Sequence, residues 1–286
     1  ANVATEAIQA VIHNFSSHIH ICTPTFSPYY EFASPDQQVT TFNLDPAMNF
    51  AVDPEAYVES VLRSHADTAV LISPNNPDGY LIPDDDLEWI LSKLTSLSTI
   101  IVDESFIHFA DNATPDGGLP SLTGITNQFD NVTIVKSMSK DFGIAGIRAG
   151  YSIMPAERVT QLLDNGYLWN TSGMAEYFFS LFDRRQFLEQ YLRELSSYKL
   201  YIDKFTSATE NFEFIQAFKT SANFQLMKLP EHVSSDVVAA LLLIRHGVYV
   251  RSCGDKIGLN GEFIRVAIRT ESENESILDA LADILG

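Results

Sequence analysis

The stretch "SMSKDFGIAGIRAG", residues 137–150, places an amine and a guanidinium in one short, glycine-punctuated segment. Lys140 follows two hydroxyl residues, Ser137 and Ser139, and Arg148 comes later in the same segment. A lysine amine acts as a covalent catalyst when its pKa falls well below the free value of about 10.4. An arginine at the start of an apolar strand needs an anion, because an unpaired charge there is costly. The alternatives are a solvated lysine and an internal salt bridge.

Three other segments carry polar groups at points where a ligand could meet them. Asn76 lies in the turn-rich "SPNNPDGY" after an apolar run, and its amide could face a ligand oxygen. Asp103 ends the run "IIVD" and could hold a positive nitrogen, because opposite charges favour each other's ionised forms. Ala4 and Thr5 of "ATEAI" begin a predicted helix, whose free N–H groups attract anions. The alternatives are a surface turn, a helix N-cap and an ordinary helix start.

Together these side chains match the functional groups of one small molecule. Ala4, Thr5, Ser137 and Arg148 could bind a phosphate, and Asn76 could bind a phenolic oxygen. Asp103 could bind a ring nitrogen, and Lys140 could react with an aldehyde. Pyridoxal 5′-phosphate (PLP) has all four groups, and its protonated ring acts as an electron sink. The sequence therefore predicts PLP as the cofactor.

The elements that would position these residues alternate along the first two thirds of the chain. Short apolar runs predict strands at 18–23, 41–44, 68–73, 98–104, 131–137 and 148–154, and helical patterns lie at 53–65 and 83–94. Nearly continuous apolar strands separated by helices indicate an α/β fold with a mostly parallel sheet covered on both faces. Ligands of such sheets bind beyond the carboxyl ends of the strands, where the candidate residues lie.

The pattern changes from about Phe182. A long amphipathic helix is predicted over 184–205, followed by strands at 222–229, 248–251 and 263–269, a helix at 234–247 and a last helix from Ser272. Thr270 and Glu273 fit a capping box at the start of that last helix. We therefore predict a large PLP-binding domain at 1–183 and a small α+β domain at 184–286.

Composition bounds the classes of function. The 286 residues carry 18 basic and 37 acidic side chains, a formal charge of −19, which argues against nucleic-acid binding. Two cysteines, Cys22 and Cys253, suggest neither a disulfide framework nor a metal site. The sequence shows no membrane-spanning run or signal peptide, so a cytoplasmic protein without membrane partners is expected. Because the chain opens directly on the helical "ANVATEAIQAVI", we also expect it to be a fragment or one domain of a longer polypeptide.

The motifs resemble those of the class I/II aminotransferases of PLP fold type I. The similarity is strongest to the branch with histidinol-phosphate aminotransferase and threonine-phosphate decarboxylase. The matching stretches are "TPTFSPYY", "SPNNPDG", "VDESF", "SMSKDFGIAGIRAGY", "WNTS", "SANFQL", "GVYVRSC" and "FIRVAIRT". They cover essentially the whole chain, and the S-x-S-K…R-x-G run is highly specific.

The resemblance implies a role for each cofactor-binding residue. Lys140 would be the Schiff-base lysine and proton shuttle, with Asp103 on the pyridinium nitrogen and Asn76 on the phenolic oxygen. Phe26 would stack on the ring, because an aromatic side chain supplies the needed face. The residues that would hold the phosphate are Ala4, Thr5, Ser137, Ser139 and Arg148.

The resemblance also implies the substrate site. Arg265 would grip a substrate carboxylate with a bidentate fork, and Arg251 beside it would read a second anionic group. Asn170 of "WNTS" would lie near the substrate. The alternative for Arg265 is an ion pair within the small domain.

The resemblance implies an aminotransferase that acts on a small, optionally phosphorylated, amino acid or amine with a 2-oxo acid partner. We also expect a homodimer, as in the family. Phe106 stands where the family's aminotransferases usually have tyrosine, and it favours the second reading, a decarboxylase of a phosphorylated amino acid. A third reading, suggested by the abrupt start, is a non-catalytic or fragmentary PLP-binding module. Family members usually carry an additional N-terminal stretch, and we expect this chain to lack it.

Overall fold

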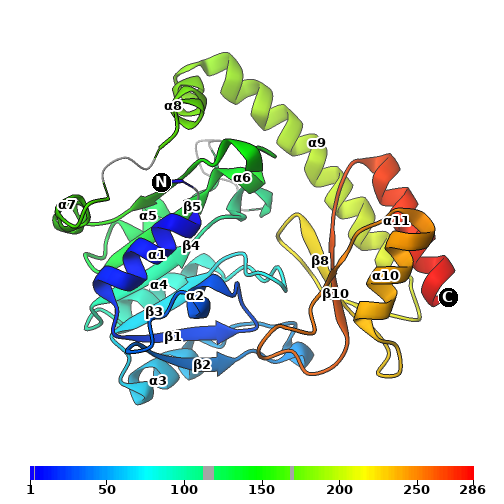
Figure 1. The fold of residues 1–286 in the computed structure, drawn as a ribbon, viewed down its shortest axis with the longest axis horizontal. Helices are drawn as coiled ribbons and strands as arrows, with labels where there is room; N and C mark the ends of the chain where they lie inside the picture. Colours follow the sequence, from blue (N-terminus) through cyan, green and yellow to red (C-terminus); the bar gives the residue numbers. More distant parts are fainter. Residues whose placement is uncertain (3, 112–118, 168–170) are drawn as a thin grey trace.

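Two sheets organise the chain. The computed structural model describes residues 1–2, 4–111, 119–167 and 171–286. A six-stranded sheet has the order β2-β1-β3-β4-β5-β6, and a four-stranded sheet has the order β7-β8-β10-β9 (Figure 1). The fold is therefore the mixed α/β fold that the alternating pattern predicted.

The six-stranded sheet is parallel except at one edge. Its strands are β1 (His18–Thr23), β2 (Gln38–Asn43), β3 (Thr68–Ile72), β4 (Thr99–Asp103), β5 (Val132–Ser137) and β6 (Gly150–Ile153). Only β6 runs antiparallel to its neighbour, with Gly150 opposite Ser137. The first five strands therefore end at the same edge of the sheet.

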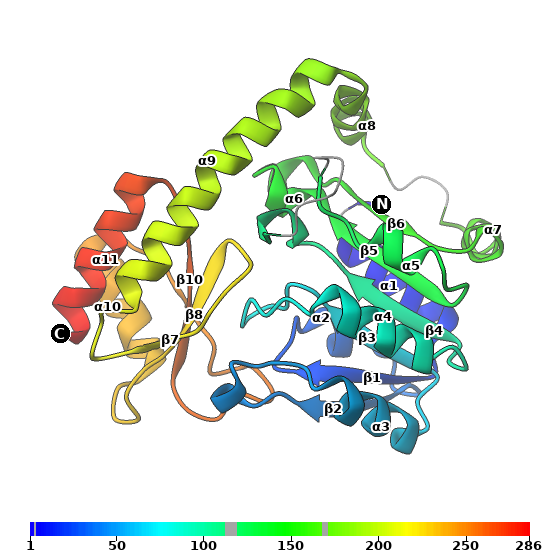
Figure 2. The same ribbon diagram turned by 180° about the vertical axis from the view of Figure 1, so that it is seen from behind.

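Helices cover both faces of this sheet. One face packs on α1 (Ala4–Phe15), and the other on α3 (Pro54–Ser64) and α4 (Asp84–Lys93), as the two opposite views show (Figures 1 and 2). Successive residues of the buried β3 alternate between the two cores: Val70 packs with α1, and Leu71 with α3 and α4. Burial on both faces explains why the strands are apolar throughout.

Shorter elements connect these layers. The short α-helices are α2 (Pro28–Glu31), α5 (Thr123–Thr126), α6 (Met138–Asp141), α7 (Ala156–Asp164) and α8 (Gly173–Ser180). The 3₁₀ helices are η1 (Pro46–Met48), η2 (Ile107–Phe109), η3 (Ala145–Ile147) and η4 (Leu181–Asp183).

The second sheet is antiparallel and packs on three longer helices. Its strands are β7 (Gln216–Ala217), β8 (Phe224–Lys228), β9 (Arg251–Ser252) and β10 (Phe263–Ala267). The helices are α9 (Arg185–Thr209), α10 (Ser235–His246) and α11 (Glu271–Leu285). The predicted capping box of Thr270 and Glu273 is confirmed at the start of α11.

Several predicted strand bounds differ from the observed ones, and two of these differences involve candidate site residues. The strand predicted at 248–251 is reduced to β9, because the amides of Gly247 and Val248 bond back to α10 and end that helix. The strand predicted at 148–154 begins only at Gly150, because Arg148 adopts a left-handed conformation (φ 61°) after η3. Arg148 therefore does not start an apolar strand.

Side chains of the second sheet enter the core of the first part of the chain. Phe263 of β10 and Leu226 of β8 belong to the same buried cluster as Leu71 and Val102. This shared packing sets one end of the small sheet against the loops of the large one. No helix in the described ranges has both the length and the apolar character needed to cross a membrane.

Candidate functional site

The loops that follow the parallel strands carry most of the candidate residues. β3 leads to the turn with Asn76, β4 ends on Asp103, and β5 ends on Ser137 directly before α6 with Lys140. Because β1 and β3–β5 are parallel neighbours, these loops lie at one edge of the sheet (Figure 1). The sheet topology thus gathers side chains that are far apart in the sequence.

Lys140 lies on α6, a single helical turn. Ser137 is the N-cap of α6, and its side chain accepts a hydrogen bond from the Ser139 amide at 3.3 Å. The Lys140 side chain is exposed, with its Nζ 6.0 Å from the ring centroid of Phe106. Although the residue as a whole is exposed, the protein around the amine removes part of its bulk water. This loss of water, and then the charges of Arg265 and Arg148, lower the pKa of Lys140. A lowered pKa raises the fraction of neutral amine, which is the nucleophilic form.

Asp103 is a buried carboxylate with two hydrogen-bond donors. The Ser105 amide donates to Oδ1 at 2.9 Å, and the Tyr29 hydroxyl donates to Oδ2 at 2.8 Å. Burial raises the pKa of Asp103, while these hydrogen bonds and the charge of Lys136 oppose the rise. Phe26 is half-buried beside this pair, with its ring centroid 6.4 Å from that of Tyr29.

Asn76 and Arg265 meet across the two sheets. Arg265 of β10 donates from Nη1 to Oδ1 of Asn76 at 2.5 Å. The guanidinium carbon also lies 4.9 Å from the ring centroid of Phe224, which in turn packs edge-on against Phe106 at 5.0 Å. A continuous row of aromatic and cationic groups therefore joins the predicted substrate arginine to the predicted catalytic lysine.

Two arginines lie side by side on the small sheet. Arg265 and Arg251 are directly opposite in the β9–β10 register, so their side chains point to the same face. Arg251 pairs with Asp255 at 2.5 Å. Burial lowers the pKa of Arg265, with Cys253 opposing this shift and the charge of Arg251 adding to it. Like charges directly opposite each other destabilise a sheet, so this pair favours an anion between them.

The proposed phosphate end is assembled from α1, β5 and α6. Ala4 and Thr5 begin α1, and the nitrogen of Ala1 just before them lies 3.0 Å from the carbonyl oxygen of Gly150. Gly150 is the register partner of Ser137, which brings the start of α1 close to the end of β5.

The two remaining phosphate candidates differ in their environment. The Ser139 hydroxyl is buried without a hydrogen-bond partner in the described ranges. Arg148 is exposed, and its Nη1 donates to the carbonyl of Ala145 at 2.9 Å. Ser139 thus has a free donor, whereas Arg148 bonds within its own turn. Asn170 lies outside the described residues.

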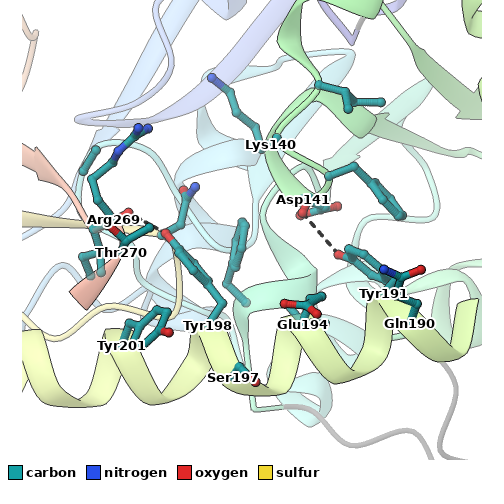
Figure 3. Close-up of a pocket in the computed structure, with 18 of the residues that line it drawn as sticks. Lys140, Asp141, Gln190, Tyr191, Glu194, Ser197, Tyr198, Tyr201, Arg269 and Thr270 are labelled. Atoms are coloured by element: carbon teal, nitrogen blue, oxygen red, sulfur yellow. Dashed lines mark hydrogen bonds between the residues drawn. The ribbon is translucent and has the colours of Figure 1, made fainter. Parts of the chain in front are cut away.

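A large cavity adjoins Lys140. Its volume is about 920 Å³, and it lies between the loop after α6, the helix α9 and the start of α11 (Figure 3). Seven of the residues that line it are aromatic, and three of these, Tyr191, Tyr198 and Tyr201, project from α9. Lys140 is at its rim, but Asp103, Asn76 and Arg265 are not in its lining. The cavity is therefore beside the candidate site. No group of three or more His, Cys, Asp or Glu side chains in the described ranges could hold a metal ion.

Sequence reasoning missed two residues of the site. Tyr29 follows the "TPTFSP" stretch, and its role as donor to Asp103 follows only from the fold. Lys136 is 1% exposed in β5, and its Nζ lies 2.5 Å from Asp141 Oδ2. A lysine inside the apolar run "VTIVKS" was a readable signal, because a buried charge needs a partner.

Comparison with known proteins places these features in a family. The model of the aminotransferase class I and II family matches residues 1–281. An L-serine phosphate decarboxylase of Campylobacter jejuni is 43% identical over 284 residues, which cover 99% of this chain and 73% of that protein. The L-serine phosphate decarboxylase of Sulfurospirillum multivorans is 39% identical, with 99% and 72% covered.

Solved structures agree. A decarboxylase from Sulfurospirillum multivorans aligns with a TM-score of 0.95 at 39% identity, covering 100% of this chain and 81% of that one. The histidinol-phosphate aminotransferase of Clostridium acetobutylicum aligns with a TM-score of 0.86 at 28% identity, covering 99% and 82%. These matches confirm the predicted resemblance and PLP fold type I.

The comparisons correct the expected reaction. Transamination with a 2-oxo acid was the main expectation, but the relatives at 39–43% identity over the whole chain are L-serine phosphate decarboxylases. The main expectation is therefore wrong, and the second reading is the better supported one. The sequence did not distinguish the two reactions because both would use the same cofactor-binding residues. They differ in which bond of the substrate is broken.

Proposed function

Because the chain belongs to the aminotransferase class I and II family, whose cofactor is PLP, we propose that it is a decarboxylase of a phosphorylated amino acid, with L-serine phosphate as the substrate. The observation that carries the substrate class is the pair of guanidinium groups, Arg251 and Arg265, opposite each other on one sheet face. A substrate with a carboxylate and a phosphate supplies an anion for each of these guanidinium groups, of which Arg251 also pairs with Asp255.

The residues present fit the cofactor. PLP supplies an aldehyde that combines with amines and a ring that accepts the electron pair released when carbon dioxide leaves. Lys140 offers an amine of lowered pKa, Asp103 a buried carboxylate for the ring nitrogen, and Ser139 a buried hydroxyl with no other partner among the described residues. We assign Phe26 to the ring face and Asn76 to the phenolic oxygen.

The phosphate end of the cofactor belongs to another group of residues. We assign it to the first amides of α1, at Ala4 and Thr5, together with the Ser137 and Ser139 hydroxyls. N–H groups at a helix start attract phosphate. Arg148 contributes its charge from the surface beside Lys140, whose pKa it lowers.

The substrate roles follow from position. Arg265, hydrogen-bonded to Asn76, faces the carboxylate, and Arg251 holds the phosphate at the outer end. The bond between the α-carbon and the carboxylate breaks, and carbon dioxide leaves. Lys140 then delivers a proton to that α-carbon, so the product is the amine ethanolamine phosphate. A decarboxylation of this kind needs no 2-oxo acid.

Product analysis tests this proposal. We expect the PLP-loaded protein with L-serine phosphate to release carbon dioxide and ethanolamine phosphate in equal amounts. L-threonine phosphate and L-serine serve as comparison substrates, and we expect L-serine to react at least about tenfold more slowly, because it lacks the phosphate contacts. Formation of a phosphorylated keto acid in place of carbon dioxide would refute the proposal.

Arg251 gives a second prediction. In the variant Arg251→Leu, KM for L-serine phosphate should rise roughly 10- to 100-fold, because a charge-assisted hydrogen bond contributes about 1.5–3 kcal/mol. The kcat value for L-serine phosphate should change little, and the rate with L-serine, which is already low, should not fall further. Steady-state kinetics on both substrates measure this, with the exposed Arg245→Leu of α10 as control. An equal loss on both substrates would remove Arg251 from phosphate recognition.

A further inference from the structure

A buried lysine links the two segments that hold the cofactor-facing residues. Lys136 of β5 is 1% exposed, and its Nζ lies 2.5 Å from Oδ2 of Asp141. The same amine donates to the main-chain carbonyl of Glu104 at 3.0 Å. Asp141 directly follows Lys140, and Glu104 directly follows Asp103. One ammonium group thus contacts both neighbours of the two predicted catalytic residues.

Asp141 faces away from the site. Lys140 and Asp141 leave the chain in opposite directions, with Asp141 on the side of Tyr191 and α9 (Figure 3). The Asp141 carboxylate is also 3.3 Å from Nδ1 of His108, and its main-chain oxygen accepts a hydrogen bond from Tyr191 at 3.4 Å. Burial lowers the pKa of His108 to about 2, so this histidine is neutral and Lys136 supplies the compensating charge.

We infer that the Lys136–Asp141 ion pair is a positioning unit that fixes Lys140 relative to Asp103. The inference depends on the roles assigned above to Lys140 and Asp103. It does not depend on which substrate the protein accepts.

The short helix explains the need for such a unit. α6 spans only Met138–Asp141, and a helix of one turn is not stable through its own hydrogen bonds. The ion pair ties the end of α6 back to β5, and the bond to Glu104 ties β5 to the end of β4. A displacement of either strand end would therefore change the separation between the amine and the carboxylate.

Stability alone is a weak explanation of the pair. Burying two charges carries a large desolvation cost, and a well-packed apolar pair of similar volume is often equally stabilising. An apolar pair would not, however, donate to the Glu104 carbonyl. It would also not supply the positive charge that opposes the rise which burial causes in the pKa of Asp103 and of Glu104.

The central experiment compares three variants of the PLP-loaded protein. Lys136→Met leaves Asp141 buried without its partner and should lower the unfolding temperature. The double variant Lys136→Met/Asp141→Leu removes both charges and should recover most of that stability. We expect it nevertheless to bind PLP at least about tenfold more weakly. Asp141→Asn, which keeps the shape and removes only the charge, should weaken PLP binding in the same direction.

A spectroscopic readout completes the test. The pH midpoint of the visible absorption of bound PLP should shift in the double variant and in Asp141→Asn. The titratable groups that face the pair are Glu104, Asp103, His108, Tyr151 and Tyr191, and these remain in every variant. The matched control is Lys204→Met/Glu271→Leu, which removes an exposed ion pair of 2.5 Å and should change neither readout.

The outcomes distinguish a positioning role of the ion pair from a purely structural role. A double variant with recovered stability and the original PLP affinity and pH midpoint would show a purely structural pair and overturn the inference. If the double variant does not fold, unchanged PLP affinity and midpoint in Asp141→Asn would overturn it equally. None of these measurements requires substrate, so a failure here is distinct from a failure of the proposed decarboxylation.

Discussion

Lys140→Ala is expected to lower kcat/KM by at least about 10³-fold, because it removes both the covalent attachment point of the cofactor and the proton donor to the substrate carbon. The fold should be unaffected, since the Lys140 side chain is exposed and makes no hydrogen bond or ion pair with other described residues. The lowered pKa of its amine, caused first by loss of water and then by Arg265 and Arg148, suits both tasks near neutral pH.

Covalent labelling makes this prediction specific. Borohydride reduction of the PLP-loaded protein should fix the cofactor on the peptide that contains Lys140, and mass spectrometry locates it. Lys140→Ala should give no labelled peptide and no visible band from lysine-bound cofactor. Lys204→Ala, an exposed lysine of α9, is the control. Labelling at another lysine, or an undiminished band in Lys140→Ala, would show that the attachment point has been misassigned.

Much of the fold was readable because its strands are buried on both faces. The run "HIHICT" became β1 with the predicted bounds, and the run at 68–73 became β3 shortened by one residue. The helix at 53–65 was equally clear, because Asp53 caps it and Pro54 begins it. Such local signals act within a few residues and need no knowledge of the rest of the chain.

The failures occurred where distant or backbone-specific contacts decide the structure. Arg148 looked like the first residue of a strand, but η3 forces a left-handed turn there and the arginine binds its own loop. The end of α10 uses the amide of Val248, which the pattern "VYVR" assigned to a strand. Periodicity reports which residues prefer burial and says little about where a hydrogen-bond ladder begins.

The candidate site could be predicted from the sequence by residue type but not in its geometry. Residue types identified an amine, a carboxylate and an amide suited to one cofactor. No sequence pattern showed that Arg265 would bond Asn76 across the sheets, or that Phe106 and Phe224 would form the row between Arg265 and Lys140. The Arg265–Asn76 and Phe106–Phe224 contacts join residues more than a hundred positions apart and depend on how the two sheets pack.

The reaction itself was the least readable property. Transamination and decarboxylation would use the same proposed lysine, aspartate and arginines, and the two reactions diverge in which bond of the substrate is oriented for cleavage. That orientation depends on small differences in how the two substrate anions are held. Phe106, which lacks the hydroxyl of the family's usual tyrosine, favoured decarboxylation together with the stretch "VYVRSC", but neither cue decided the reaction.

Asp103→Asn should lower kcat by about 10²-fold or more, equal to roughly 2.7 kcal/mol in activation free energy. Asparagine fills the same space but carries no charge, so a protonated ring nitrogen loses its counter-ion. Burial makes this loss large, because Asp103 is 3% exposed and little water can replace the missing charge. The effect should fall on kcat more than on KM, since the ring accepts electrons only after substrate has bound.

Tyr29→Phe is the matched variant for this prediction. It removes the 2.8 Å hydrogen bond to Asp103 and leaves the carboxylate in place, so the loss should be smaller, about 5- to 10-fold. The pKa of Asp103 should rise further in this variant, because the Tyr29 hydroxyl of the parent protein favours the ionised carboxylate and the variant lacks it. Activity would therefore decline at a higher pH in Tyr29→Phe than in the parent protein as the medium is acidified. Equal activity of Asp103→Asn and the parent would mean that this carboxylate does not hold the ring nitrogen. If Tyr29→Phe lowered kcat as much as Asp103→Asn does, the orientation of the carboxylate would matter more than its charge.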